Sequence, residues 1–292
     1  MRDFEYHAPK TMEEALALIA HYKEEAKIFA GGQSLLVVMK QGLVSPEHII
    51  DIKGLSAMDY VRYDQEKGLR IGALTTHRAI ERSPVIKQHF RVLSEMERNL
   101  ATVQTRNWGT IGGNLCHGDP SGDPAIAFIA LGATLKLASL SGERTLDMEA
   151  FSMDMLEVAL EPGEMLVEIL VPVPKPYTGV AHEKLMVLQG DSGIVGAAVS
   201  LTLEKGDGVC KDARIALSNA ATIPLRAREA EKRLIGGQIT DHVLAEAAQV
   251  ASSEADPPTD MHASEEYRRE MLKVLVRRAA KKAMERAKGG LA

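Results

Sequence analysis

Apolar and polar residues alternate along the first 56 residues in patterns that change between helix and strand. Residues 12–22 carry apolar side chains on one helical face, directly after a possible N-cap at Thr11. Apolar runs that read as short strands lie at residues 4–6, 27–30 and 48–52. This alternation predicts a small α/β subdomain over residues 1–56.

The pattern changes after residue 57. A hairpin is predicted at residues 61–73, followed by a short helix that ends at Ile80 and a longer helix from Pro84 to Leu100. Strands are then predicted at residues 134–138, 144–146 and 165–171. Prolines at 172, 174 and 176 interrupt the pattern, so a second subdomain is expected over residues 57–176.

The remaining residues, 177–292, predict a third domain in which strands come first and helices follow. The expected strands are 182–188, 195–204 and 209–217, with a turn at Gly206-Asp207-Gly208. The expected helices are 226–235, one that begins at Thr240, and 264–287.

Composition narrows the possible functions. The formal net charge of −5 gives no reason to expect nucleic-acid binding. No window is apolar for long enough to span a membrane, and the first ten residues have no signal-peptide pattern, so we expect a cytoplasmic protein. The only cysteines, Cys116 and Cys210, cannot supply a four-thiolate iron–sulfur cluster or a cysteine-rich zinc site.

Two glycine pairs stand out as candidate ligand-binding segments. The first glycine segment, Ala30-Gly31-Gly32-Gln33-Ser34-Leu35, follows a predicted strand, and the second is Thr110-Ile111-Gly112-Gly113-Asn114. Glycine allows positive φ and close approach of main-chain N–H groups to an anion such as a diphosphate. Neither stretch contains Lys or Arg, and neither matches a Walker loop or a dinucleotide fingerprint. We therefore expect main-chain N–H groups, hydroxyls and amides to hold the anion.

Asp123 precedes Pro124 and a continuous apolar run. This order predicts an N-cap, a proline at the first helical position and a buried helix.

The two segments, together with Asp119-Pro120 and Asp123, resemble the FAD loops of the flavin-binding medium subunits of molybdenum hydroxylases, the carbon monoxide dehydrogenase and xanthine dehydrogenase family. The resemblance extends to both ends of the chain, including Asp256-Pro257-Pro258. It implies an α+β fold of the PCMH/VAO FAD-binding type. Two α/β subdomains would clasp FAD, and a C-terminal three-stranded sheet with flanking helices would follow.

The resemblance also implies roles for individual residues. Both glycine segments would wrap the diphosphate, and Asp123 would hydrogen-bond ribityl or ribose hydroxyls. Leu166 would contact the flavin or adenine, and Lys184 would lie near the isoalloxazine ring. Gln33 stands where carbon monoxide dehydrogenase-like chains often have His, which leaves the subclass open.

The implied function is electron transfer within a complex. The chain would pass electrons from [2Fe-2S] clusters of a small subunit through FAD to an external acceptor. A molybdopterin-binding large subunit would oxidise the substrate, and the assembly would be a dimer of heterotrimers. No catalytic residue or metal ligand is assigned to this chain. Two alternatives stay open at this point, a self-sufficient flavin reductase with the same loop geometry and a flavin-free scaffold.

Overall fold

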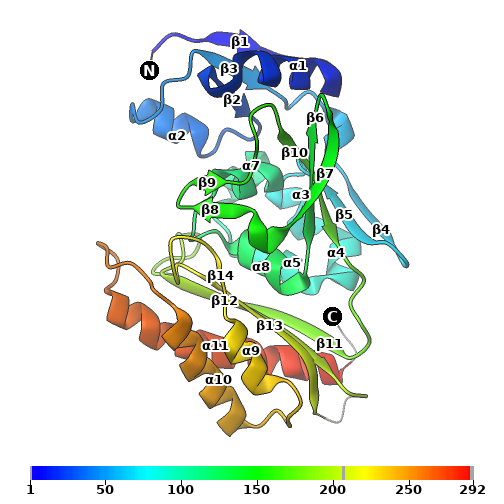
Figure 1. Cartoon of the computed structure of the whole chain (residues 1–292), viewed down its shortest axis with the longest axis vertical. Helices are drawn as coiled ribbons and strands as arrows, with labels where there is room; N and C mark the ends of the chain where they lie inside the picture. Colours follow the sequence, from blue (N-terminus) through cyan, green and yellow to red (C-terminus); the bar gives the residue numbers. More distant parts are fainter. Residues whose placement is uncertain (1, 206–207, 290–292) are drawn as a thin grey trace.

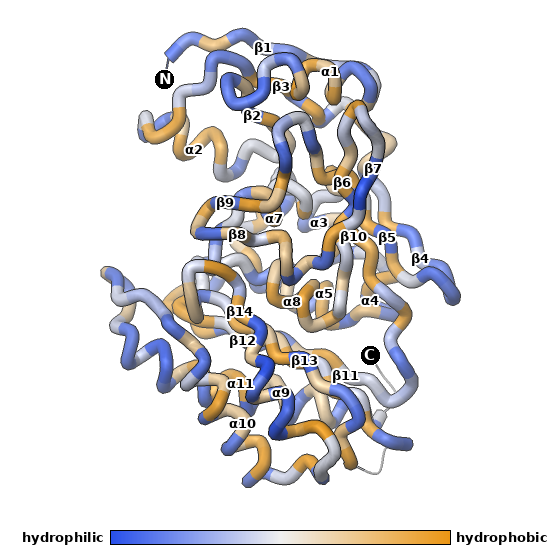
Figure 2. Tube along the Cα trace, in the orientation of Figure 1, coloured by the Kyte–Doolittle hydropathy of each residue, from blue (hydrophilic) through white to orange (hydrophobic). Residues whose placement is uncertain are grey.

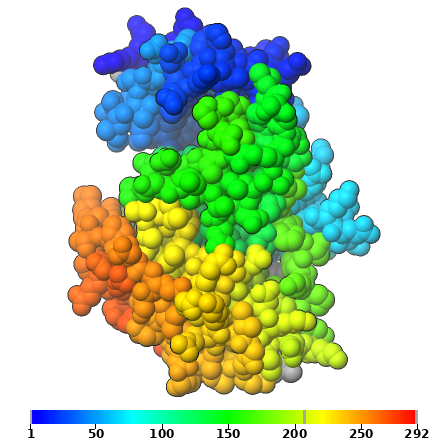
Figure 3. Space-filling model, viewed as in Figure 1, coloured from blue at the N-terminus to red at the C-terminus, as the bar shows by residue number. Residues whose placement is uncertain are grey.

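The computed structural model describes residues 2–205 and 208–289, and its elements form three parts stacked along the long axis (Figures 1 and 3). The first part is a small parallel sheet of order β1-β3-β2 with helices beside it. Its elements are β1 (Glu5–His7), α1 (Met12–Tyr22), β2 (Ala26–Phe29), α2 (Leu35–Lys40) and β3 (His48–Asp51), with a 3-10 turn at Lys23–Glu25. Thr11 caps α1 as predicted, because its hydroxyl accepts a hydrogen bond from the Glu14 N–H.

The middle part is an antiparallel sheet of order β4-β5-β10-β6-β7. Its strands are β4 (Val61–Asp64), β5 (Gly68–Gly72), β6 (Thr134–Ser139), β7 (Gly142–Asp147) and β10 (Met165–Val171). The hairpin β8 (Ser152–Asp154) and β9 (Glu157–Val158) and 3-10 turns at Ser56–Met58 and Met148–Ala150 complete it.

Six helices accompany the middle sheet within the described residues. They are α3 (His77–Arg82), α4 (Pro84–His89), α5 (Arg91–Arg98), α6 (Val103–Trp108), α7 (Ile111–His117) and α8 (Asp123–Leu131). The single helix predicted from Pro84 to Leu100 is therefore wrong, because α4 and α5 are separated at Phe90. The backbone of Phe90 leaves the helical region (φ −141°, ψ 53°) while its ring is buried in the core.

The C-terminal part is an antiparallel sheet of order β11-β12-β13-β14. Its three long strands are β11 (Thr178–Leu185), β12 (Val195–Leu203) and β13 (Cys210–Ser218), and the two-residue β14 (Leu225–Arg226) joins its edge. The helices are α9 (Arg228–Leu234), α10 (Asp241–Glu254) and α11 (Glu265–Lys288). Gly206 and Asp207 of the predicted turn lie outside the described residues. The fold is α+β, as the family resemblance implied.

Hydrophobic contacts join the three parts. One core cluster combines α1 and β3 with Met165 and Val167 of the middle sheet. Another packs α8 against Ala198 of β12 and Ala216 of β13, and Figure 2 shows α8 as a hydrophobic segment between the middle and C-terminal sheets. Because these contacts fix the parts against one another, residues from all three can line one site. No helix in residues 2–205 and 208–289 has the length and apolar character of a bilayer span.

Candidate functional site

A cleft of about 560 Å³ lies where the three parts meet. A cavity of this size is typical of small-molecule and cofactor sites. All but one of the site residues proposed from the sequence line it, namely Ala30, Gly31, Gly32, Gln33, Ser34, Leu35, Thr110, Gly112, Gly113, Asn114, Asp123, Leu166 and Lys184. Ile111 does not, because its side chain is fully buried in the core beside the cleft.

The first glycine segment offers unpaired main-chain donors to this cleft. It connects the end of β2 to the start of α2. Among the described residues, the backbone N–H groups from Gly31 to Leu35 donate no hydrogen bond to the protein. Gly32 has φ +70°, a conformation that side chains with a Cβ rarely adopt. A turn that presents successive free N–H groups matches an anion nest.

Close packing of the two loops explains the other glycine of this pair. A Cβ on Gly31 would lie 2.3 Å from the carbonyl oxygen of Trp108 and 2.7 Å from the Cα of Gly109. Any side chain at position 31 would therefore push the first glycine segment away from the chain that leads into the second. Position 31 therefore requires glycine, because there is no room for a Cβ atom.

The second glycine segment differs from the prediction. Residues 111–117 form α7, so Gly112 and Gly113 have no positive φ. The N–H groups of Ile111 and Gly112 donate to Thr75 and Ala73 (3.0 and 2.9 Å), and those of Gly113 and Asn114 donate to Thr110 (3.2 and 3.0 Å). The expectation that free main-chain donors in this segment hold an anion is therefore wrong. The segment can still offer the Asn114 amide, which makes no hydrogen bond among the described residues, and the Thr110 hydroxyl proton.

The N-cap predicted at Asp123 is also wrong. The cap of α8 is Gly122, and no side chain caps this helix. Instead, the Asp123 carboxylate accepts a hydrogen bond from Lys184 Nζ at 2.7 Å, and its other oxygen lies 3.4 Å from His182 Nε2. Lys184 and His182 both come from β11, so contact with a distant strand has replaced a local cap.

The three side chains are almost completely buried, with exposed fractions of 3–5%. Burial alone raises the pKa of Asp123. The neighbouring His182 and Lys184 outweigh that effect, so the net pKa of Asp123 lies below its ordinary value. Asp123 is therefore ionised, and it compensates the charge of Lys184 at the wall of the cleft.

Sequence reasoning missed a second buried pair, His77 and Glu97. His77 begins α3 and lines the cleft, and its Nδ1 lies 2.9 Å from a carboxylate oxygen of Glu97 on α5. Burial raises the pKa of Glu97, although His77 opposes the rise. One signal was available, since Glu97 lies four residues after Leu93 and so occupies the apolar face of its helix.

The loop between β11 and β12 was missed as well. Gly190, Asp191 and Ser192 line the cleft, and a Cβ on Gly190 would lie 2.9 Å from the carbonyl oxygen of Ala101. His117 and Cys116 also line it. Burial raises the pKa of the Cys116 thiol to about 12, which favours the neutral thiol over the thiolate.

Comparison with known proteins identifies the family. Residues 2–174 match the FAD binding domain in molybdopterin dehydrogenase, and residues 181–283 match the CO dehydrogenase flavoprotein C-terminal domain. The chain belongs to the FAD-binding medium subunits of molybdenum hydroxylases. As a member of this family it is an oxidoreductase subunit with FAD as its cofactor, which removes the flavin-free scaffold from consideration.

Relatives match over nearly the whole chain. The carbon monoxide dehydrogenase medium chain of Afipia carboxidovorans is 36% identical over 285 residues, which cover 98% of each chain. The 6-hydroxypseudooxynicotine dehydrogenase complex subunit alpha of Paenarthrobacter nicotinovorans is 34% identical and covers 98% of this chain and 96% of its own. A solved carbon monoxide dehydrogenase from Hydrogenophaga pseudoflava superposes with a TM-score of 0.94 at 36% identity, covering 98% of both chains.

The cleft of this medium subunit fits FAD. The free N–H groups of the first glycine segment suit a diphosphate, and a lining that includes both the apolar Leu166 and the ionised Asp123 suits a molecule with both a ring and hydroxyl groups. FAD, once bound, supplies the ability to accept and donate one or two electrons.

Proposed function

We propose that this medium subunit passes electrons from the [2Fe-2S] clusters of a small partner subunit, through FAD, to an external acceptor. A molybdopterin-binding large subunit would oxidise the substrate. The observation that carries the proposal is a cleft with unpaired main-chain donors in a chain of the FAD-binding medium-subunit family. The two cysteines of this chain cannot supply a four-thiolate cluster, so in this proposal the clusters belong to a partner subunit.

We also propose how the chain's residues hold the cofactor. The N–H groups of residues 31–35 would bind the diphosphate, with the Thr110 hydroxyl and the Asn114 amide on the other side. Asp123 would accept hydrogen bonds from sugar hydroxyls, and Leu166 would cover an apolar ring. Lys184 would contribute a positive charge near the flavin, but a weakened one, because Asp123 lies 2.7 Å from it.

Exposed apolar side chains near the cleft support a docking role for this side of the molecule. Trp108, Leu156 and Leu188 are 62%, 58% and 68% exposed, and each lies in or within two residues of the segments that line the cleft. In this proposal a partner subunit covers these three side chains. A partner bound here would place its clusters close to the flavin.

The test is electron transfer in a reconstituted complex. The FAD-loaded chain is combined with its large and small partner subunits, and substrate is added without oxygen in a stopped-flow spectrometer. We expect the flavin absorbance to bleach after the cluster absorbance, and external acceptor to be reduced only when FAD is present. Clusters that become reduced while the flavin stays oxidised would refute the proposal.

One further measurement tests the alternative of a self-sufficient flavin reductase, and another tests the assembly state of the complex. A chain that turns over a substrate with its own flavin, without partners, would favour the self-sufficient reductase. Light scattering of the assembled complex measures whether it is a dimer of heterotrimers.

A further inference from the structure

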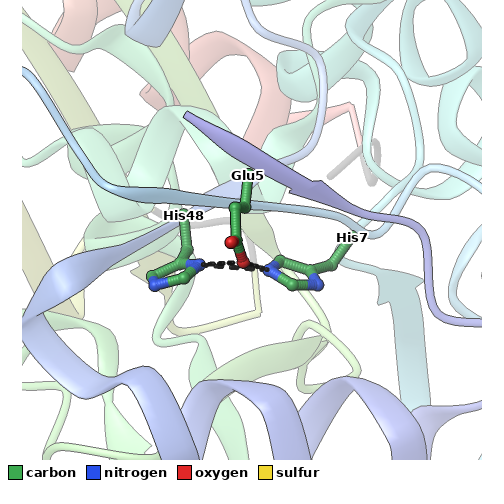
Figure 4. Close-up of side chains that lie close together, drawn as sticks. All are labelled: Glu5, His7 and His48. Carbon is green, nitrogen blue, oxygen red and sulfur yellow. Dashed lines mark hydrogen bonds and ion pairs between the residues drawn. The ribbon is translucent and has the colours of Figure 1, made fainter. Parts of the chain in front are cut away.

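Glu5, His7 and His48 form a compact cluster in the first part of the molecule. Figure 4 shows the Glu5 carboxylate directed toward the nitrogens of both imidazoles. None of the three residues lines the FAD cleft. The cluster therefore has no place in the function proposed above and needs its own explanation.

The strand register brings these side chains together. β1 and β3 are parallel neighbours, with Glu5 beside His48 and His7 beside Ile50. Because alternate residues of a strand point to the same face, Glu5 and His7 share a face with His48. Tyr6 points to the other face, where its hydroxyl donates a hydrogen bond to Asp51.

The distances within the cluster match those between ligands of one metal ion. His7 Nε2 lies 3.2 Å from His48 Nδ1, and one Glu5 oxygen lies 3.4 Å from His48 Nδ1 and 3.9 Å from His7 Nε2. A tetrahedral ion with ligand bonds of about 2.0 to 2.1 Å separates its ligand atoms by roughly 3.3 Å. A His–His hydrogen bond explains the shortest distance, but it does not require a carboxylate facing the same two nitrogens.

We propose that Glu5, His7 and His48 bind a divalent transition-metal ion of the Zn²⁺ type. Two imidazoles and one carboxylate form a donor set that zinc accepts, whereas Mg²⁺ and Ca²⁺ prefer oxygen ligands alone. Three protein ligands leave a fourth position for water, on the side where Glu5 is exposed to solvent. Glu25 and Glu47 also lie close to His48 and add negative charge that attracts a cation.

The surroundings hold both imidazoles in position. The Tyr22 ring at the end of α1 stacks on His48 with centroids 3.7 Å apart and on His7 with centroids 5.0 Å apart. Both histidine side chains are mostly buried, with exposed fractions of 20% and 13%. Ligands fixed in this way lose little freedom when a metal binds. The ion would fasten the three-residue edge strand β1 to the central strand β3 and so stabilise the first part of the molecule.

The experiment measures metal binding directly. Full-length chain without a histidine tag is loaded with FAD, treated with a chelator, and titrated with Co²⁺, whose visible absorption bands report tetrahedral coordination. We expect one Co²⁺ per chain, displacement of Co²⁺ by Zn²⁺, and a higher thermal midpoint when Zn²⁺ is present. Absence of a stoichiometric site would overturn the proposal.

Variants assign the ligands. His7→Ala and His48→Ala should each weaken Co²⁺ and Zn²⁺ binding by at least about 100-fold, and Glu5→Gln by at least about 10-fold. His21→Ala, a neighbouring exposed histidine that contacts Tyr22, is the matched control and should bind metal as the wild type does. Glu5 is exposed, so its variant should fold, and the flavin content of every variant measures folding independently of metal binding. Unchanged metal affinity in the Glu5 and His7 variants would overturn the assignment.

Discussion

Replacing Asp123 by Asn should destabilise the apoprotein strongly, because it leaves the Lys184 ammonium buried without a counter-charge. Asn has nearly the same shape as Asp, so no cavity forms and the effect is mostly electrostatic. The exposed fractions of 3% and 5% place the pair inside the protein, where solvent screening is small. Removal of one partner of a buried pair typically costs about 3 to 5 kcal/mol. We expect the calorimetric midpoint to fall by on the order of 10 °C.

A double variant separates this cause from general disruption. Asp123→Asn/Lys184→Met removes both charges, so no buried charge is left without a partner. The double variant should therefore recover at least about 2 kcal/mol relative to Asp123→Asn. The exposed pair Lys232–Glu229 supplies the control, since Glu229→Gln should change stability by no more than about 0.5 kcal/mol. A double variant no more stable than the single one would refute the reasoning.

The same pair predicts a pH dependence with a definite sign. The pKa of Asp123 is lowered in the folded state, so its contribution is complete above the unfolded value of about 3.9. That contribution is lost as the pH falls through the folded-state pKa. The difference in unfolding free energy between wild type and Asp123→Asn should therefore be constant near neutral pH and shrink below about pH 3.9.

Three further predictions concern the cleft. Gly32→Ala should lower the FAD content of the purified chain, because residue 32 has φ +70° and the new Cβ would lie 2.5 Å from the Phe29 ring. Gly42→Ala is the control, since residue 42 has a similar φ of +75° but open space around it, and this variant should keep its FAD. Gly112→Ala should lower the thermal midpoint of the apoprotein, because its Cβ would lie 2.7 Å from the Ala73 carbonyl oxygen; an unchanged midpoint would contradict the packing argument. Glu97→Gln keeps an acceptor for a histidine N–H but removes a carboxyl whose pKa is raised by burial. The unfolding free energy of this variant relative to wild type, measured by urea titration, should therefore increase as the pH rises above about 4.3. A difference between the two proteins that does not depend on pH would refute this prediction.

The sequence by itself determined many of the local elements and about a third of the residues that line the cleft. The sequence pattern predicted the starts of α1, α10 and α11 to within one residue, and the structure shows that Thr11, Thr240 and Ser264 each cap the helix that follows. Two glycine pairs in strand and helix context located the segments that meet at the cleft. These signals are local, so a single sequence carries them.

Tertiary structure decided what each residue does there. Asp123 follows the local rule for an N-cap, but Lys184 and His182 of β11 lie beside it, and Lys184 donates a hydrogen bond to its carboxylate. Position 112 lies in a helix and still requires glycine, because Ala73 approaches too closely for any side chain.

Two further features depend on residues that are far apart in the sequence. One is the part of the cleft region formed by His77, Glu97 and residues 190–192, and the other is the cluster of Glu5, His7 and His48. Local periodicity specifies which face of an element is buried. It does not specify which distant element covers that face, and the covering element determines the charge, hydrogen bonding and free space at a site.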